Sequence, residues 1–235
     1  MFSLLNAAKR GKIGPLKEAI KLGANLEIRD PEGATALILA SHHRQPACVQ
    51  LLIDANANLD ARNHEGNTAL ICASESCDVA CMRLLINARA NVEVRRGDGY
   101  TALMVTAENN DLESMQLLID AKANIEAKNA DGATALLCAV LNQGPACVQL
   151  LINAKADLEA EFQDGITALI LSTKMNDPEC LQLLIDADAY IDATYGHGHT
   201  ALIEAAKQNH FECMRLLLNA GADMEVMCER GHNAL

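Results

Sequence analysis

The sequence is poor in aromatic residues, in positive charge and in long apolar stretches. It has no tryptophan, three tyrosines and three phenylalanines among 235 residues, which excludes a core built from large rings. Hydrophobic residues nonetheless make up 50% of the chain, so leucine, isoleucine, alanine, valine and cysteine must fill the interior of a folded protein. No apolar run approaches the roughly 18–20 residues that span a bilayer.

The charge balance and the cysteine content narrow the class of protein. Lysine and arginine total 19 against 31 acidic residues, a formal net charge of −12. Because phosphate backbones and anionic lipids attract basic proteins, we expect neither a nucleic-acid nor a membrane partner. Nine cysteines are too few for a disulfide scaffold in a chain of this length, and the first residues lack the pattern of a signal peptide. We therefore expect an intracellular, cytoplasmic location.

A fixed period runs through nearly the whole sequence. Its phase is marked by Gly33, Gly66, Gly99, Gly132, Gly165, Gly198 and Gly231. Threonine stands two residues after each of the first six glycines, and Ala-Leu follows every time. A fixed period of this size is typical of stacked-repeat architectures, in which each unit packs on its neighbours.

Within the unit 63–95, the sequence predicts two short helices. A turn around Gly66 uses a backbone conformation that residues with side chains avoid. Thr68 can cap a helix over 69–76. Apolar residues at helical spacing then predict a second helix over 80–88, and the rest of the unit leads out as an extended segment.

Helix, helix and hairpin in a unit of this length resemble the ankyrin repeat. The resemblance covers essentially all of the sequence. It implies an all-α ankyrin-repeat solenoid of helix-turn-helix units, each of about 33 residues, joined by β-hairpin-like loops. It also implies an N-terminal capping repeat at 1–29, a truncated seventh-repeat stub at 228–235 and six ankyrin-type repeats at 30–62, 63–95, 96–128, 129–161, 162–194 and 195–227.

The sequence departs from the family's Thr-Pro-Leu-His signature and from its glycine after the second helix. Alanine replaces proline in all six repeats, and an apolar residue replaces histidine, as at Ile38 and Ile71. Gly23 and Gly221 keep the later glycine, whereas the internal repeats have Asn56, Arg89, Lys122, Lys155 and Asp188. A side chain at a left-handed position costs on the order of 1 kcal/mol, so we expect strain at these five residues.

Five cysteines share one repeat position near the start of the second helix. They are Cys48, Cys81, Cys147, Cys180 and Cys213. A thiol relay or metal ladder would need sulfurs closer than the roughly 8–10 Å between stacked helices, so we favour buried small hydrophobes. We likewise interpret His197, His199 and His232 as solvated hairpin residues rather than zinc ligands. No metal and no cofactor are expected.

No combination of nucleophile and base, and no phosphate-binding glycine loop, indicates catalysis, so we expect a non-enzymatic protein. Carboxylates do recur once per repeat in the hairpin, at Glu27, Asp60, Glu93, Glu126, Glu159, Asp192 and Glu225. Like charges about 10 Å apart in water repel by only about 0.4 kcal/mol. We therefore interpret this series as a polar hairpin face.

The resemblance implies a recognition surface in a concave groove, formed by the hairpin tips and the inner face of the first helices. Residues 129–235 carry 5 basic and 15 acidic residues, a net charge of −10. Aromatic and apolar anchors among charges concentrate binding energy, although scattered exposed hydrophobic residues also occur without a function. The candidate partner-binding residues are Tyr100, Asp131, Leu141, Glu161, Phe162, Asp164, Ile166, Met175 and Tyr195.

The resemblance implies a protein–protein interaction module that is mostly monomeric. The charge of the later repeats indicates a partner with a basic segment and a bulky apolar side chain. Two alternatives stay open: a regulatory or targeting segment of a larger enzyme or membrane protein, and a slice of a long structural repeat array. Because hairpin tips carry little core, we expect Phe162 and Tyr195 to contribute to binding and little to stability.

Overall fold

A computed structural model of the chain describes residues 4–228, with fourteen α-helices and one short pair of β-strands. The chain divides into two compact units, Met1–Asn124 and Ile125–Leu235. The prediction of an all-α chain of repeated helix-turn-helix units is confirmed. The predicted stub at 228–235 lies outside the described residues except for Cys228. Within residues 4–228, no helix is both long and apolar enough to cross a membrane.

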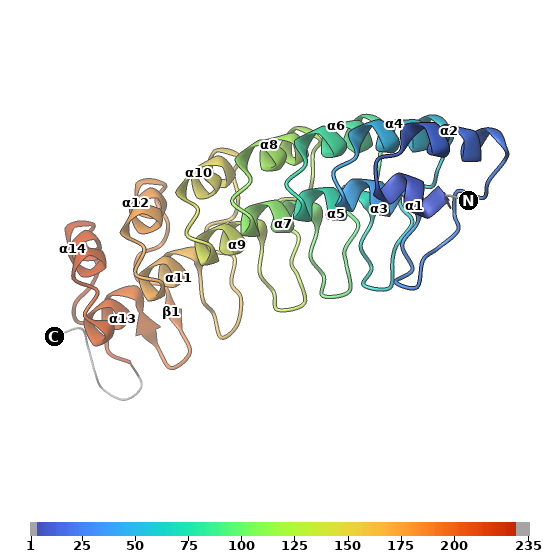
Figure 1. Ribbon diagram of the computed structural model, residues 1–235. Coiled ribbons are helices and arrows are strands. Elements are labelled where there is room, and N and C mark those ends of the chain that lie inside the picture. Colours follow the sequence, from blue (N-terminus) through green and yellow to red (C-terminus); the bar gives the residue numbers. More distant parts are fainter. Residues whose placement is uncertain (1–3, 229–235) are drawn as a thin grey trace. The chain divides into compact units, whose positions relative to one another are not determined.

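The first unit consists of four helix pairs. The first helices of the pairs are α1 (Leu4–Lys9), α3 (Ala36–His42), α5 (Ala69–Glu75) and α7 (Ala102–Glu108). The second helices are α2 (Ile13–Lys21), α4 (Pro46–Asp54), α6 (Val79–Asn87) and α8 (Leu112–Asp120). Within this unit each set forms a row, and the loops that join one pair to the next extend away from the row of first helices (Figure 1).

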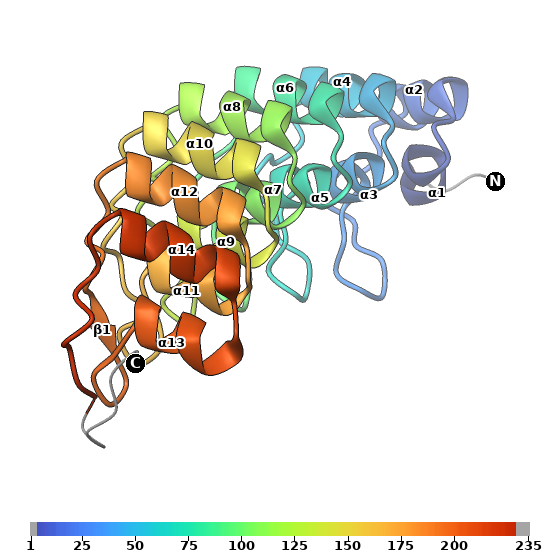
Figure 2. The ribbon, with the colours of Figure 1, turned by 90° about the vertical axis from the view of Figure 1, so that its left-hand side faces the viewer.

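The second unit repeats this arrangement with three helix pairs. Its first helices are α9 (Ala135–Leu141), α11 (Ala168–Lys174) and α13 (Ala201–Gln208), and its second helices are α10 (Pro145–Asn153), α12 (Pro178–Asp186) and α14 (Phe211–Asn219). Figure 2 shows α10, α12 and α14 side by side. The predicted extended segments are mostly turns. Strands β1 (Thr194–Tyr195) and β2 (His199–Thr200) form a two-residue antiparallel ladder, and a single bridge joins Phe162 to Ile166.

The recurring threonine begins the first helix of each pair, as the repeat predicts. The hydroxyls of Thr35, Thr68, Thr101 and Thr200 each accept a hydrogen bond from the N–H three residues later. Thr134 and Thr167 hold the same position, but their hydroxyls have no hydrogen-bond partner within the described part of the chain. Threonine thus precedes the first helix in all six repeats, but in two of them its side chain makes no capping hydrogen bond.

Small side chains and cysteines let neighbouring helices approach closely. Ala69 and Ala73 of α5 have no exposed surface, and the five cysteines that share one position are all buried. The prediction that they are core residues is confirmed. Burial, with the charges of Asp177 and Glu212, raises the pKa of Cys213 to about 11. This thiol is therefore uncharged at neutral pH and packs as a small hydrophobe.

The recurring carboxylate joins each hairpin to the next repeat. Asp60 accepts a hydrogen bond of 2.9 Å from the backbone N–H of Asn91, and the same bond recurs at the equivalent positions of other repeats. The other pairs are Glu27 with Asn58, Glu93 with Asn124, Glu126 with Asp157, Glu159 with Tyr190, and Asp192 with Asp223. Each carboxylate thus satisfies a backbone donor of the adjoining repeat. The interpretation of these residues as a polar hairpin face did not include this role.

The positions predicted to be strained are left-handed. The angle φ is 60° at Asn56, 68° at Arg89, 65° at Lys122, 68° at Lys155 and 63° at Asp188. The structure adds a second left-handed position, in the turn between the two helices of a pair, which the sequence analysis missed. It is occupied by Arg44, Cys77, Asn110, Gln143, Asn176 and Asn209.

Glycine at Lys155 should stabilise the protein. The substitution Lys155→Gly removes a left-handed cost of about 1–2 kcal/mol and adds an entropic cost of glycine of about 0.5–1 kcal/mol. We expect the free energy of unfolding, measured by urea denaturation, to rise by about 0.5–1 kcal/mol. Lys155→Ala is the control, because alanine keeps the left-handed cost. An alanine variant as stable as the glycine variant would contradict the backbone explanation.

Candidate functional site

The hairpins of the second unit are closed in two different ways. In the first of them, Asn129 Oδ1 accepts hydrogen bonds from the N–H groups of Asp131 and Ala133, at 3.0 and 2.8 Å. Phe162 and Tyr195 occupy the position of this asparagine in the next two hairpins. Backbone pairing across the hairpin replaces the side-chain bonds there. The two aromatic side chains are therefore presented where other hairpins use a polar side chain to close the turn.

The predicted partner-binding residues differ in how much of their surface reaches solvent. Tyr100 lies in the first unit, half-buried, and the Arg96 guanidinium is 4.5 Å from its ring centroid. In the second unit, Leu141 and Phe162 are half-buried. The exposed residues of the set are Asp131, Glu161, Asp164 and Met175.

Ile166 is not an exposed anchor, contrary to the prediction. Its side chain is 8% exposed, and its backbone exchanges two hydrogen bonds with Phe162, of 3.0 and 3.1 Å. The same repeat position is buried at Ala34, Asn67 and Ala133, so it faces the core just before the first helix begins. Ile166 is therefore removed from the candidate surface.

Tyr195 is also engaged within the protein. Its hydroxyl donates a hydrogen bond of 2.5 Å to Glu204 Oε2, and Gln208 donates a second bond to the same carboxylate. The Lys174 ammonium lies 4.7 Å from the Tyr195 ring centroid, a cation–π distance, and the His199 ring packs beside it. These contacts favour a contribution of Tyr195 to stability, contrary to the expectation for hairpin-tip residues.

Glu204 is the buried centre of this cluster, with 4% of its surface exposed. Burial raises its pKa, but hydrogen bonds from Tyr195 and Gln208 and the charges of Lys207 and Lys174 outweigh burial and lower the pKa. Burial and the bond to Glu204 raise the pKa of Tyr195. Sequence reasoning missed this cluster because its members come from α11, β1, β2 and α13, with no recognisable spacing.

Charge on the second unit is mixed rather than uniformly acidic. The repeat position of Leu141 in α9 is taken by Lys174 in α11 and by Lys207 in α13. The hairpins carry exposed carboxylates, at Asp131, Glu161 and Asp164. The exposed carboxylates among the candidate residues thus lie in the hairpins, while lysines stand near the ends of two of the first helices.

Comparisons with known proteins agree on the architecture. A family model of ankyrin repeats, in three copies, matches residues 4–96, 82–162 and 139–228. The crystal structure of the ankyrin repeat domain of Bcl-3, a member of the IkappaB protein family, is similar with a TM-score of 0.82 and 28% identity, over 90% of this chain and 97% of that one. The human ASB11 ankyrin repeat domain has a TM-score of 0.80 and 24% identity, over 94% and 98% of the two chains. This second likeness shows the fold alone.

A sequence relative is also found, over a shorter stretch. The putative ankyrin repeat protein YahD of Escherichia coli strain K12 is 47% identical over 51 residues. The match spans 22% of this chain and 25% of that protein.

Removing the Tyr195 hydroxyl should destabilise the second unit. Tyr195→Phe leaves the buried Glu204 carboxylate without one of its donors, which costs about 1–3 kcal/mol. The free energy of unfolding from denaturant titration measures the loss. Tyr190→Phe is a matched control, because Tyr190 is 62% exposed and should lose nothing. Equal stability of the two variants would show that the Tyr195–Glu204 bond contributes nothing.

The ionised carboxylate of Glu204 should make the stability of the protein depend on pH. Because its pKa is lowered in the folded chain, its contribution is present above the ordinary glutamate pKa of about 4.3 and is lost as the pH falls through the lowered value. Wild type should therefore unfold at a higher temperature than Glu204→Gln at pH 7. The difference should shrink below about pH 4. A difference that is constant across this range would contradict the assignment.

Proposed function

Because the chain belongs to the ankyrin repeat family, whose repeats generally act as protein–protein interaction modules, we propose that its second unit binds a protein partner between the hairpins and the ends of the first helices. The observation that carries the proposal is exposed or half-exposed apolar surface at Met175, Leu141 and Phe162. This surface stands beside exposed carboxylates. Such a combination favours a bound protein segment over a small molecule.

Leu141 stands at a position that faces the hairpins. His42 and Glu75 hold the same repeat position in the first unit, and there both line a cavity together with hairpin residues. An apolar residue at this position offers a partner a contact that excludes water. Met175 directly follows α11 and adds a flexible side chain, 36% exposed, of the kind that adapts to varied partners.

The charge of the hairpins supports a basic segment in the partner. Asp131, Glu161 and Asp164 are exposed, whereas the nearby ammonium of Lys174 already interacts with the ring of Tyr195. Complementary charge speeds association and makes binding weaken with salt, while apolar anchors slow dissociation. We therefore propose a partner with lysine or arginine residues around one bulky apolar side chain.

The proposal is tested with a random peptide library displayed on phage and selected on the immobilised full chain. Selected peptides should be enriched in basic residues around a large apolar residue. Replacing Phe162 and Met175 together by alanine should weaken the best peptide by about 2 kcal/mol, roughly 30-fold, in titration calorimetry.

The matched control replaces Phe211 and Leu218 by alanine. These residues are 73% and 40% exposed and lie on α14, in the row of second helices of the same unit. The control pair should leave the peptide affinity unchanged. Enrichment of acidic peptides, or a loss as large from the α14 pair, would overturn the proposed surface.

A further inference from the structure

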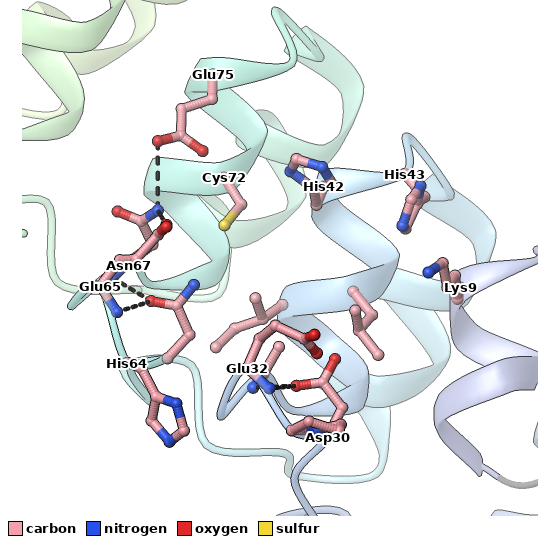
Figure 3. A pocket seen from close by; sticks show the side chains of 15 residues that line it. Lys9, Asp30, Glu32, His42, His43, His64, Glu65, Asn67, Cys72 and Glu75 are labelled. Carbon is pink, nitrogen blue, oxygen red and sulfur yellow. Dashed lines mark hydrogen bonds between the residues drawn. The ribbon is translucent and has the colours of Figure 1, made fainter.

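A cavity of about 590 Å³ lies in the first unit, between the hairpins and the first helices. At one end of it His42, from α3, meets Cys72 and Glu75, from α5 (Figure 3). A ring nitrogen of His42, the sulfur of Cys72 and a carboxylate oxygen of Glu75 all lie within 4.8 Å of one another. Three different types of metal ligand are thus brought together at the wall of an open cavity.

We propose that His42, Cys72 and Glu75 bind a divalent transition-metal ion, and that zinc fits the site best. Imidazole nitrogen, thiolate sulfur and carboxylate oxygen all bind Zn²⁺, at about 2.0–2.3 Å. Around a tetrahedral ion with such bonds, neighbouring ligand atoms stand about 3.3–3.8 Å apart. Binding would require the three atoms to close from within 4.8 Å of one another to this spacing. Because all three residues line the cavity, water from the cavity would occupy the fourth position.

Hydrogen bonds hold the two helices that carry the ligands in place. The Ser76 hydroxyl lies 2.9 Å from the carbonyl oxygens of both His42 and Cys72, and so ties the end of α3 to α5. The hydroxyl has one proton to donate, so it joins the backbones of the two ligand residues by one hydrogen bond at a time and does not touch the ligand atoms. This contact links the end of α3 to α5 at the site without any bound ion.

The carboxylate of Glu75 is oriented as well. Its Oε1 accepts hydrogen bonds from Asn67 Nδ2 at 3.3 Å and from the Arg96 guanidinium at 3.1 Å. The positive charge of Arg96 is shared with Asp98, 2.8 Å away, which reduces its repulsion of a bound cation. Both contacts go to the same oxygen, so Glu75 Oε2 is the oxygen assigned to the metal.

A buried polar atom on the same cavity is also unsatisfied. Asn67 is 4% exposed, and its Oδ1 has no hydrogen-bond partner among residues 4–228. A buried acceptor without a donor costs free energy. Asn67 lines this cavity, but its Oδ1 is closed to solvent, so this acceptor is not counted as part of the metal site.

The thiol is protonated until an ion displaces its proton. Burial, with the charges of Glu75 and Glu65, raises the pKa of Cys72 to about 12. A coordinated cation favours the thiolate strongly enough to reverse this. Cys72 is 3% exposed, so the ion reaches it from the cavity side, past His42, whose side chain is exposed.

The experiment uses the full chain in a Cys77→Ser background, because Cys77 is an exposed thiol that could bind metal adventitiously. The probe is Co²⁺ alone, followed by Zn²⁺ in competition with a chelating dye. We expect one Co²⁺ per chain, with a thiolate-to-cobalt charge-transfer band in the ultraviolet. Zn²⁺ should abolish the band.

Three variants separate the site from general effects. Cys72→Ser should remove the band, and His42→Ala should lower Zn²⁺ affinity at least about tenfold without disturbing the fold, since His42 is exposed. Cys138→Ser is the matched control. Cys138 is buried at the same repeat position as Cys72, but its repeat has Leu141 at the position that Glu75 holds in the repeat of Cys72. This control should bind as the background protein does. Absence of the band in the background protein, its survival in Cys72→Ser, or unchanged affinity in His42→Ala would overturn the site.

Discussion

The position of the hairpins depends on a recurring carboxylate that accepts a backbone N–H from the next repeat. The helices stack by burying apolar surface, but the hairpins bury little and need another restraint. In the repeat 30–62, Asn58 Oδ1 accepts the N–H of Asp60, and Asp60 in turn accepts the N–H of Asn91 in the next repeat. Each polar side chain thus orients the next. Backbone bonds between neighbouring hairpins, such as that from Gly97 N–H to the Glu65 carbonyl oxygen, complete the restraint.

This polar series restrains the hairpin tips, on which several of the proposed partner-binding residues stand. Because the hairpins are restrained in the same way, equivalent positions place their side chains alike in neighbouring hairpins. One substitution at such a position therefore changes the surface of one repeat only. Phe162 and Tyr195 illustrate two uses of the same position. Tyr195 is taken up by an internal network with Glu204 and Lys174, whereas Phe162 stays half-exposed among carboxylates. The same repeat position thus carries an internal contact in one hairpin and a half-buried residue of the proposed binding surface in the other.

The periodicity of the sequence was enough to predict the fold and much of its local chemistry. The glycine and threonine phase predicted where first helices begin, and the missing glycines predicted left-handed residues at positions such as Lys155. What the phase could not predict is which side chains of different elements meet. His42 and Cys72 come from different repeats, and Tyr195 reaches Glu204 from a different element, so neither contact leaves a spacing signal. The burial of Ile166 was missed for a simpler reason, since an isoleucine in a hairpin was assumed to face outward although its repeat position faces the core.

The shared cysteine position has a practical consequence for following the motions of the molecule. Five of the seven helix pairs carry one buried thiol at an equivalent place in the second helix, at Cys48, Cys81, Cys147, Cys180 and Cys213. A buried thiol reacts with an alkylating reagent only while its surroundings open, and in stacked repeats opening spreads between neighbours. The chain therefore carries its own set of reporters on local opening. The order in which these five thiols become alkylated would trace how opening travels along each unit, without any label having been introduced.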